Sequence, residues 1–404
     1  MSGLRPCFAD MHVHIGSSGD GRPVKISASR GLTFQAIAEE ASERKGIALL
    51  GVIDCHSPAV QADIGRLLDT GEMSEVQGGG IRYRDTVIVP GAEIEVREPG
   101  WGGGPYHVLA YLPSLAAMKE WTAWMSPRMK NVALSSQRIR ATGRELQQEL
   151  LDRGGLLVPA HVFTPHRGLL GCSADRLSDR LDPDGIAAVE LGLSADSAMA
   201  GRLSQLDRYP VLTNSDAHST GMIGRECNEL LLGEPSFAEF ALALRGQDGR
   251  RVTANLGLHP KLGKYHASYC PSCRSPLPDG EAGAVCPACG SARLVTGVDA
   301  RISRLADRDE PFWPAGRPPY RHQVPLHFFP GVGPKMRERL LREVGTEMDV
   351  LHRIDRERIA AAAGDRIAEA ILDARAGRLE LTAGSGGTYG RIGGREKTRT
   401  DDRA

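Results

Sequence analysis

The 404-residue sequence has few aromatic residues, no excess of either charge and no long apolar run. Aromatic residues make up 5% of it, yet 41% is hydrophobic and 25% is charged, which is enough for ordinary cores and unlike a disordered chain. Fifty Lys and Arg residues balance fifty Asp and Glu residues, so any binding to nucleic acid or an anionic membrane needs a local patch. No apolar stretch approaches the roughly 20 residues that span a bilayer, and MSGLRPCFADMHVH has no apolar core of a signal peptide. We therefore expect a cytoplasmic protein without a membrane partner.

The length suggests two or three domains. Residues 1–255 alternate apolar, mostly β-branched runs such as DTVIVPGAE and YPVLTNSDAH with helical patterns such as LTFQAIAEEASERKG and SQRIRATGRELQQELLDRGG. Runs of this kind suit strands that are buried on both faces of a parallel sheet. About seven strands, near residues 7, 49, 86, 106, 156, 187 and 210, predict an α/β barrel or a doubly wound sheet.

The remaining chain divides by composition into four segments. Residues 256–295 contain four cysteines and few apolar residues, and a Pro-rich connector spans 296–324. Residues 325–380 have helical sequence, and 381–404 form a Gly-rich and then charged tail.

Histidines and carboxylates gather at the ends of the expected strands. They are His12 and His14, Asp54 and His56, Glu93, His107, His161, and Asp216 and His218. The carboxyl ends of parallel strands form the active-site face of α/β folds, so these side chains should converge. Any one of these histidines alone is better explained as an ordinary core or surface residue, but chance does not explain six of the twelve histidines at strand ends. Imidazole with carboxylate binds Zn, Mn or Fe, and Glu93 is suited to bridge two ions, which predicts metal-assisted hydrolysis.

In order, the motifs DMHVH, IDCH, GAE, PYH, PAH and SDAH resemble the polymerase and histidinol phosphatase (PHP) superfamily. The resemblance implies a distorted seven-stranded β/α barrel with up to three metals. It assigns His12, His14, Glu93 and Asp216 to a first metal, Glu93, His107 and His161 to a second, and His56 and His218 to a third, with Asp216, Glu93 and His218 in catalysis. Many members place Asp or His five positions after the second His, where this chain has Gly19; Asp20 or Asp54 is the alternative.

Two CxxC pairs, Cys270 with Cys273 and Cys286 with Cys289, have the spacing of a structural zinc site. Bound zinc would supply folding free energy that this polar segment lacks. Disulfides or redox chemistry are the weaker alternative, because the other four cysteines are scattered. The module is either a ribbon that contacts a partner such as DNA or an internal clamp.

Residues 326–341, LHFFPGVGPKMRERLL, predict a helix, a Gly-Val-Gly turn and a second helix. The segment resembles the helix-hairpin-helix motif, which grips the DNA backbone. The residues expected to contact phosphate are Gly331, Gly333, Lys335, Arg337 and Arg339. The alternative is an ordinary helical hairpin. A second hairpin is expected in ERIAAAAGDRIAEAILDARAG.

The order of these modules, with strings such as PAHVFTPHRGLLG, TNSDAHS and HQVPLHFFPGVGPK, resembles the endonuclease Q family from about residue 6 to 393. The resemblance implies a DNA endonuclease that cuts on the 5′ side of deaminated bases (uracil, hypoxanthine, xanthine) and abasic sites and so initiates repair. Its implied cofactors are two or three divalent metals (Zn, Mn or Mg) and one structural zinc. The implied partner is damaged DNA, so the protein would be associated with the nucleoid when bound to it. Other repair proteins are a further class of implied partner.

A lesion pocket is expected among the family-like strings, because the damaged base must leave the stack to be selected. Its candidates are Phe163, His166, Glu190, Ser194 and Tyr265. Candidates for the DNA path are Lys261, Lys264, Arg317 and Arg321, unless they are solvated surface. Two other functions remain alternatives: a phosphomonoesterase of the histidinol-phosphatase kind, and a non-catalytic DNA-binding protein.

Overall fold

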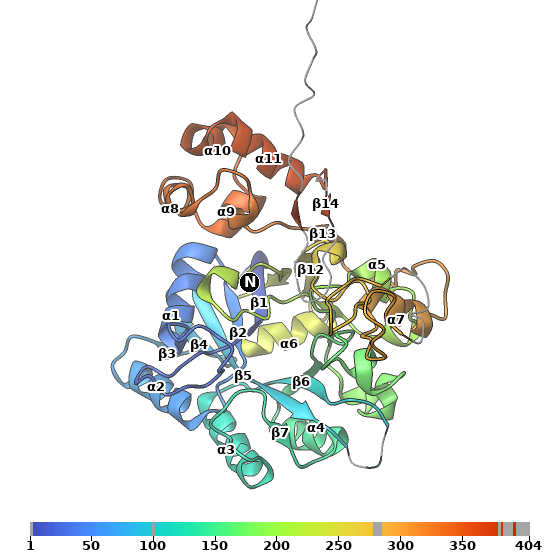
Figure 1. Ribbon diagram of the computed structural model, residues 1–404. Coiled ribbons are helices and arrows are strands. Elements are labelled where there is room, and N and C mark those ends of the chain that lie inside the picture. The colour runs from blue at the N-terminus through green and yellow to red at the C-terminus, as the bar shows by residue number, and fades with distance from the viewer. Residues whose placement is uncertain are drawn as a thin grey trace, which may run out of the picture.

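The computed structural model describes residues 3–98, 100, 102–277 and 285–378, together with two short strands at 381–382 and 391–392. An α/β fold occupies the N-terminal part, the four-cysteine segment lies beside it near helix α7, and the C-terminal helices gather at one end (Figure 1). Apart from the two short strands, the tail expected at 381–404 lies outside the described residues.

A mixed sheet forms the centre of the fold. Its strands are β1 (Arg5–Val13), β2 (Leu49–Val52), β3 (Ser74–Glu75), β4 (Ile81–Tyr83), β5 (Thr86–Val96), β6 (Tyr106–Tyr111), β7 (Arg138–Ile139), β8 (Leu156–Pro159), β11 (Cys227–Leu232), β12 (Arg251–Gly257) and β13 (Tyr320–His322). Strands β1, β2 and β5 are parallel neighbours. The pairs β1–β11, β11–β12, β5–β6 and β6–β8 are antiparallel.

The expectation of a purely parallel sheet is therefore wrong. A strand that is buried on both faces has the same apolar pattern in either direction, so the runs could not reveal strand polarity. The connection 97–105 between β5 and β6 is too short for a parallel crossover and leaves antiparallel pairing.

All seven segments expected as strands do form strands. The last two, β9 (Val189–Glu190) and β10 (Val211–Leu212), are short and pair in parallel with each other. Single bridges join Leu157 of β8 to Ile186 and Val13 of β1 to Ala217, so β9 and β10 lie between β8 and β1.

Two hydrophobic clusters take alternate residues of these strands. One cluster contains one face of the strands together with helix α6 (Phe237–Arg245). It includes Ala9, Met11, Leu49, Val87, Val89, Leu109, Tyr111, Val158, Leu212 and Phe240. The opposite face packs with most of the other helices in the second cluster. This alternation fixes which side chains can reach the strand ends.

The remaining helices are α1 (Phe34–Glu39), α2 (Pro58–Asp69), α3 (Leu115–Met125), α4 (Gly143–Leu151), α5 (Ser197–Ala200), α7 (Val298–Leu305), α8 (Pro334–Glu343), α9 (Glu347–His352), α10 (Arg356–Ala363) and α11 (Asp365–Arg375). The first expected helix continues from α1 through a π-helical turn to Gly46, whose φ of 76° closes it. The second is shorter than expected. It begins at a capping box between Thr142 and Glu145, and β7 takes the residues before it. Helix α7 lies in the segment expected as a connector.

A buried ion pair attaches the C-terminal helices to the α/β fold. Lys45 Nζ lies 2.6 Å from Glu347 at the start of α9, and both side chains are 3% exposed. Lys45 also donates to the carbonyl of Gly221, and Glu347 accepts the amide of Leu326. In Figure 1, α8 and α9 accordingly lie directly against the part of the fold that contains α1. None of the helices in the described residues is both long and apolar enough to span a membrane.

Replacing Lys45 by Met should destabilise this attachment by roughly 3–5 kcal/mol, because the Glu347 carboxylate would stay buried without its partner. Differential scanning calorimetry measures the loss as a lower Tm. The exposed pair of Arg44 with Glu338 is the control: Arg44→Ala should cost no more than about 1 kcal/mol. Equal Tm values for the two variants would contradict the assignment.

Candidate active site

The end of β1 delivers two imidazoles to one point. His12 and His14 alternate with Val13, so both rings lie on one side of the strand, and both are buried. Their Nε2 atoms lie 3.5 and 3.4 Å from Oδ1 of Asp216. Each Nε2 also lies 3.6 Å from an oxygen of Glu93, His12 facing Oε1 and His14 facing Oε2.

Glu93 of β5 joins this group to a second one. Its Oε1 lies 2.7 Å from Nδ1 of His107 on β6 and 3.2 Å from Nε2 of His161, which follows β8. Two triads result: His12, His14 and Asp216, and Glu93, His107 and His161. Within each triad the ligand atoms lie within 4.8 Å of one another.

The residues fit divalent metal ions. The Nε2 atoms of His12 and His14 are buried and have no hydrogen-bond partner, which is costly unless a ligand takes their lone pairs. Two donors that each lie about 2.1 Å from one ion are about 3.0–3.5 Å apart. The observed separations of 3.4–3.6 Å are close to that range and long for hydrogen bonds.

Two outer carboxylates direct these lone pairs inward. Nδ1 of His12 donates to Glu190 at 3.0 Å, and Nδ1 of His14 donates to Asp54 at 3.0 Å. A proton held at Nδ1 leaves Nε2 free for a metal. Asp54, expected as a ligand, thus lies behind His14. Glu190, expected at the lesion, lies behind His12 and also accepts the amide of His161 and the Asn214 side chain.

The residues expected for a third metal do not form a third triad among the described residues. His56 is fully buried, and its Nε2 donates to the carbonyl of Leu134 at 3.2 Å. His218 donates from Nδ1 to the carbonyl of Asp216, and its ring lies 4.6 Å from that of His14. Asp20 is exposed and pairs with Arg22.

A lysine that sequence reasoning missed reaches the bridging carboxylate. Lys25 Nζ lies 3.3 Å from Oε2 of Glu93 and 2.6 Å from Oγ of Ser136, which itself donates to Glu93. Lys25 stands in RPVKIS, one of the strings that the family resemblance contains, but its contact with Glu93 depends on chain segments far apart. Asp10 was missed as well; it accepts the amides of Ser215 and Gly224 and holds the loop around Asp216.

Neighbouring groups of opposite charge compensate the buried charges of the site. Burial disfavours the charged form of Glu93, but the His107 imidazole and the Lys25 ammonium hold its pKa well below the usual range. Burial alone would lower the pKa of His12, yet the carboxylates of Glu190, Asp216 and Glu93 raise it to about 10. The carboxylates therefore demand positive charge, which divalent ions would supply.

The backbone is strained where these side chains meet. Ser136, His161 and Asp216 have φ values of 51°, 28° and 46°, in a region that non-glycine residues rarely adopt. All three contact Glu93 or His12. Strain of this kind is held where surrounding contacts over-determine a residue and marks functional sites.

A cavity of about 300 Å³ opens over the two triads. Its walls include His166, Glu190, Ser194 and Tyr265 from the expected lesion pocket, together with Lys264. The rings of His166 and Tyr265 meet edge to face at 5.5 Å. Phe163 is fully buried in the hydrophobic core and does not line this cavity, so its expected place in the pocket is wrong.

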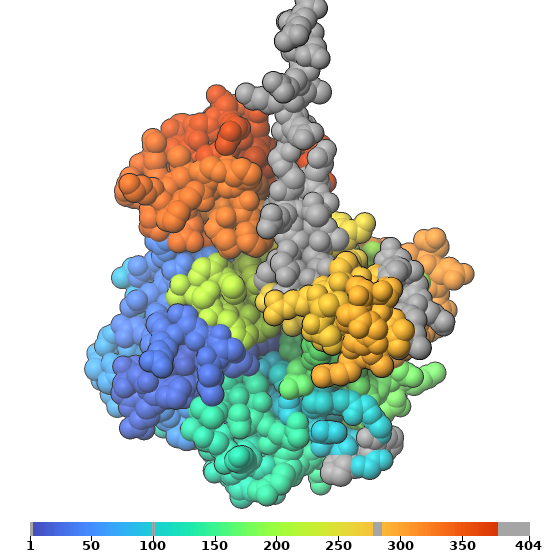
Figure 2. Space-filling view, viewed as in Figure 1, coloured from blue at the N-terminus to red at the C-terminus, as the bar shows by residue number. Residues whose placement is uncertain are grey.

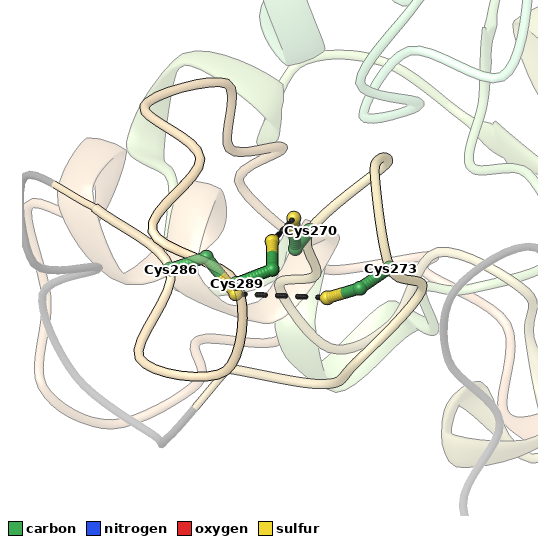
Figure 3. A group of neighbouring side chains, drawn as sticks. All are labelled: Cys270, Cys273, Cys286 and Cys289. Carbon is green, nitrogen blue, oxygen red and sulfur yellow. Dashed lines mark hydrogen bonds between the residues drawn. The ribbon is translucent and has the colours of Figure 1, made fainter.

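The four cysteines converge in a separate cluster (Figure 3). Cys270 and Cys289 lie 3.6 Å apart through their sulfur atoms, and Cys273 and Cys286 lie 3.7 Å apart. All four are free rather than disulfide-bonded. Thiolates at about 2.3 Å from a tetrahedral zinc are about 3.8 Å apart, so the cluster is suited to zinc.

The expected hairpin is present in part. The helix before the turn is only a 3-10 turn, Leu326–Phe328. Gly331 has φ 92°, and Gly333 caps α8. Glycine at φ 92° allows the tight turn that a side chain would strain.

The residues expected to contact phosphate differ in their exposure and in whether they already pair with a carboxylate. Gly331, Gly333 and Lys335 are exposed. Arg339 pairs with Glu343 at 2.9 Å, and Arg337 is half-buried beside Gly221. A second hairpin joins α10 to α11 at Gly364.

The other basic candidates are divided between cavity and surface. Lys264 lines the cavity, and Lys261 is exposed. Arg317 donates to the Leu206 carbonyl, and Arg321 lies 4.0 Å from Glu229.

Comparisons with known proteins identify the family, although no family model matches the sequence. The uncharacterized protein YqxK of Bacillus subtilis (strain 168) is 50% identical over 390 residues, which cover 96% of this chain and 100% of YqxK. The crystal structure of the novel lesion-specific endonuclease PfuEndoQ from Pyrococcus furiosus matches at 30% identity with a TM-score of 0.82. That match covers 96% of this chain and 95% of PfuEndoQ. The chain belongs to the endonuclease Q family. As a member it is a metal-dependent hydrolytic nuclease, and the two triads are the residues that fit its metals.

A second endonuclease Q structure, a complex with a 27-mer duplex substrate that has an abasic lesion at the active site, matches with a TM-score of 0.84. The identity is 30%, and the match covers 99% of this chain and 100% of that one. The endonuclease Q resemblance therefore includes the α/β fold, the cysteine segment and the C-terminal helices.

Replacing Glu190 by Gln should weaken metal binding roughly 10–100-fold, because His12 would lose the carboxylate that fixes its proton. Asp216→Asn should weaken it further, since the carboxylate faces both Nε2 atoms. Metal titration followed by mass spectrometry measures both. Asp20→Asn is the control, and an equal loss in that variant would contradict the site.

Cys270→Ser should remove one zinc per chain and lower the Tm, since three thiolates hold the ion poorly and the segment has only a small core of its own. The half-buried Cys172 provides the matched control, Cys172→Ser. Elemental analysis after dialysis checks this, and unchanged zinc content in the Cys270 variant would refute the cluster as a zinc site.

Proposed function

We propose that this protein cuts one DNA strand on the 5′ side of a deaminated base (uracil, hypoxanthine or xanthine) or an abasic site and thereby initiates repair. The observation that carries the proposal is the match, along nearly the whole chain, to an endonuclease Q complex with an abasic lesion at its active site. The complete pair of ligand triads under a cavity supports it.

In the proposed reaction, water is added across a P–O bond of the backbone. Divalent ions, when bound, lower the pKa of water and stabilise charge on the entering and leaving oxygens. His12, His14, Glu93 and Asp216 would hold one ion and Glu93, His107 and His161 the other, with Zn, Mn or Mg as candidates. Lys25 positions Glu93 between the two groups and adds a fixed positive charge beside the phosphate.

We propose that His218 acts on the substrate beside Asp216. It lines the cavity, and its Nδ1 is already hydrogen-bonded to the Asp216 carbonyl, so its Nε2 remains for the substrate. A third ion at His56 is not proposed, because this residue belongs to no group of three converging ligands among the described residues. The damaged nucleotide would enter the cavity against His166, Glu190, Ser194 and Tyr265.

The pairings from β1 through β10 and back to β1 support a closed, distorted seven-stranded barrel as the frame of the active site. We also propose that the chain divides into domains and segments after residues 255, 295, 324 and 380, as the sequence predicts. A structural zinc holds the cysteine module, and the first hairpin contacts phosphates through Gly331, Gly333 and Lys335. Such contacts position the DNA without reading its sequence. The enzyme would act in the cytoplasm at the nucleoid, beside other repair proteins.

A phosphomonoesterase of the histidinol-phosphatase kind would use the same ligands. The cysteine cluster and the two hairpins disfavour it, because a small substrate needs neither. A DNA-binding protein without activity is disfavoured by the unpartnered, buried Nε2 atoms of His12 and His14, which face the carboxylates at a distance that suits shared metal ions.

The test uses end-labelled duplexes with one uracil, hypoxanthine, xanthine or abasic site, incubated with protein and Mg²⁺, Mn²⁺ or Zn²⁺. We expect a single nick on the 5′ side of the lesion, seen on a sequencing gel, and none in the undamaged duplex. Asp216→Asn should abolish nicking while DNA binding, followed by anisotropy, persists.

Histidinol phosphate is assayed beside the DNA. Phosphate release with every duplex intact would replace the proposal by the phosphomonoesterase. Binding of the lesion duplex without any nick would leave a non-catalytic binding protein.

A further inference from the structure

One large apolar side chain lies in solvent at the mouth of the active site. Ile26 is 83% exposed. Its neighbours Lys25 and Ser27 both line the 300 Å³ cavity. The other exposed large apolar residues in the described part of the chain have no such neighbours: Leu151, Val285, Phe312, Trp313 and Phe328.

Ile26 stands at the tip of a rigid turn. The amide of Ala28 donates to the carbonyl of Lys25 at 3.0 Å, which closes the turn. Lys25 is held at both ends, since its amide donates to Ile15 and its Nζ donates to Ser136. The amide of Ser29 donates to the carbonyl of His218 at 2.8 Å. The tip is therefore fixed relative to the metal ligands.

Nothing in the folding of this turn calls for isoleucine. Tight turns favour Gly, Pro, Asn, Asp and Ser, whose side chains or backbone freedom suit the geometry. A β-branched apolar side chain gains stability from burial, and Ile26 has almost none. An apolar group presented rigidly beside a substrate cavity is instead suited to a contact made with the substrate.

We propose that Ile26 is a wedge that enters the base stack and occupies the space vacated when the damaged nucleotide turns into the cavity. The proposal rests on the proposed function and adds the residue that holds the duplex open. Minor-groove and base-extruding proteins insert Ile, Leu, Met or Phe between base steps for this purpose. Ile26 is thus a positioning residue and takes no part in the hydrolysis.

The position of the turn that contains Ile26 suits both the entry of the nucleotide into the cavity and the filling of the gap that it leaves. Figure 2 shows the blue N-terminal segment and the yellow segment of residues near 265 on the same face of the molecule. Ile26 comes from the first segment and the cavity residue Tyr265 from the second. Because Lys25 and Ser27 on either side of Ile26 line the cavity, a nucleotide that leaves the stack for the cavity would leave its gap near Ile26.

The test compares Ile26→Ala with the wild type in single-turnover nicking at saturating enzyme. On a duplex with one paired uracil the variant should be slowed roughly 10–100-fold, the effect of losing most of the buried area of one aliphatic side chain. On the same uracil strand without its complement the two should agree within about 3-fold, because a flexible single strand has no paired stack to hold open. Ile26→Met should restore most of the duplex rate.

Leu151→Ala is the matched control, an exposed aliphatic side chain on α4 away from the cavity, and it should nick both substrates at the wild-type rate. Thermal unfolding of Ile26→Ala should match the wild type, since its side chain packs on little. Equal duplex rates for Ile26→Ala and wild type would overturn the wedge, as would equal slowing on single and double strands. Failure of the wild type to nick any lesion would instead overturn the proposed function.

Discussion

The active site depends on one buried carboxylate. Glu93 has almost no contact with solvent, and a lone charge there would be untenable without compensation. Compensation comes from every side: His12 from β1 and His14 directly after it, His107 from β6, His161 after β8, and Lys25 from the first loop. Because these partners come from several strands and loops, the need to neutralise Glu93 ties the strand ends together and sets the separation of the two ligand triads.

A second layer makes the imidazoles usable. Asp54 and Glu190 each accept a hydrogen bond from Nδ1 of one histidine, which keeps the proton on Nδ1 and leaves the buried Nε2 without a partner. Such a nitrogen costs stability in the metal-free protein, as do the positive φ angles of His161 and Asp216. The fold accepts these costs where ligands bind, which is why the unsatisfied atoms point to the function more directly than the satisfied ones.

The sequence predicted much of this site because its information is local. Alternation in His12-Val13-His14, and the position of Glu93 and Asp216 after apolar runs, needed only the strand period. The sequence could not predict that the sheet contains both parallel and antiparallel pairs, since burial is the same for strands in either orientation. The roles of Asp54 and Glu190 were also beyond it, because a carboxylate that binds metal and one that orients an imidazole are identical in sequence. Lys25 and Ser136 meet at Glu93 only through tertiary packing, so no spacing could reveal them.

The balanced net charge acquires a meaning from this arrangement. The negative charge of the active-site carboxylates is compensated by the histidines and would be compensated further by bound metals. The exposed Lys335 lies on the C-terminal helices, which Lys45 and Glu347 attach to the α/β fold. Lys45 also holds the carbonyl of Gly221, and Arg337 of the hairpin lies beside the same glycine. That loop begins at Asp216. The segment expected to contact the DNA backbone and the loop that contributes the candidate ligand Asp216 therefore share one anchor. If the hairpin binds phosphates as proposed, this anchor would hold them at a fixed distance from metal ions at the two triads.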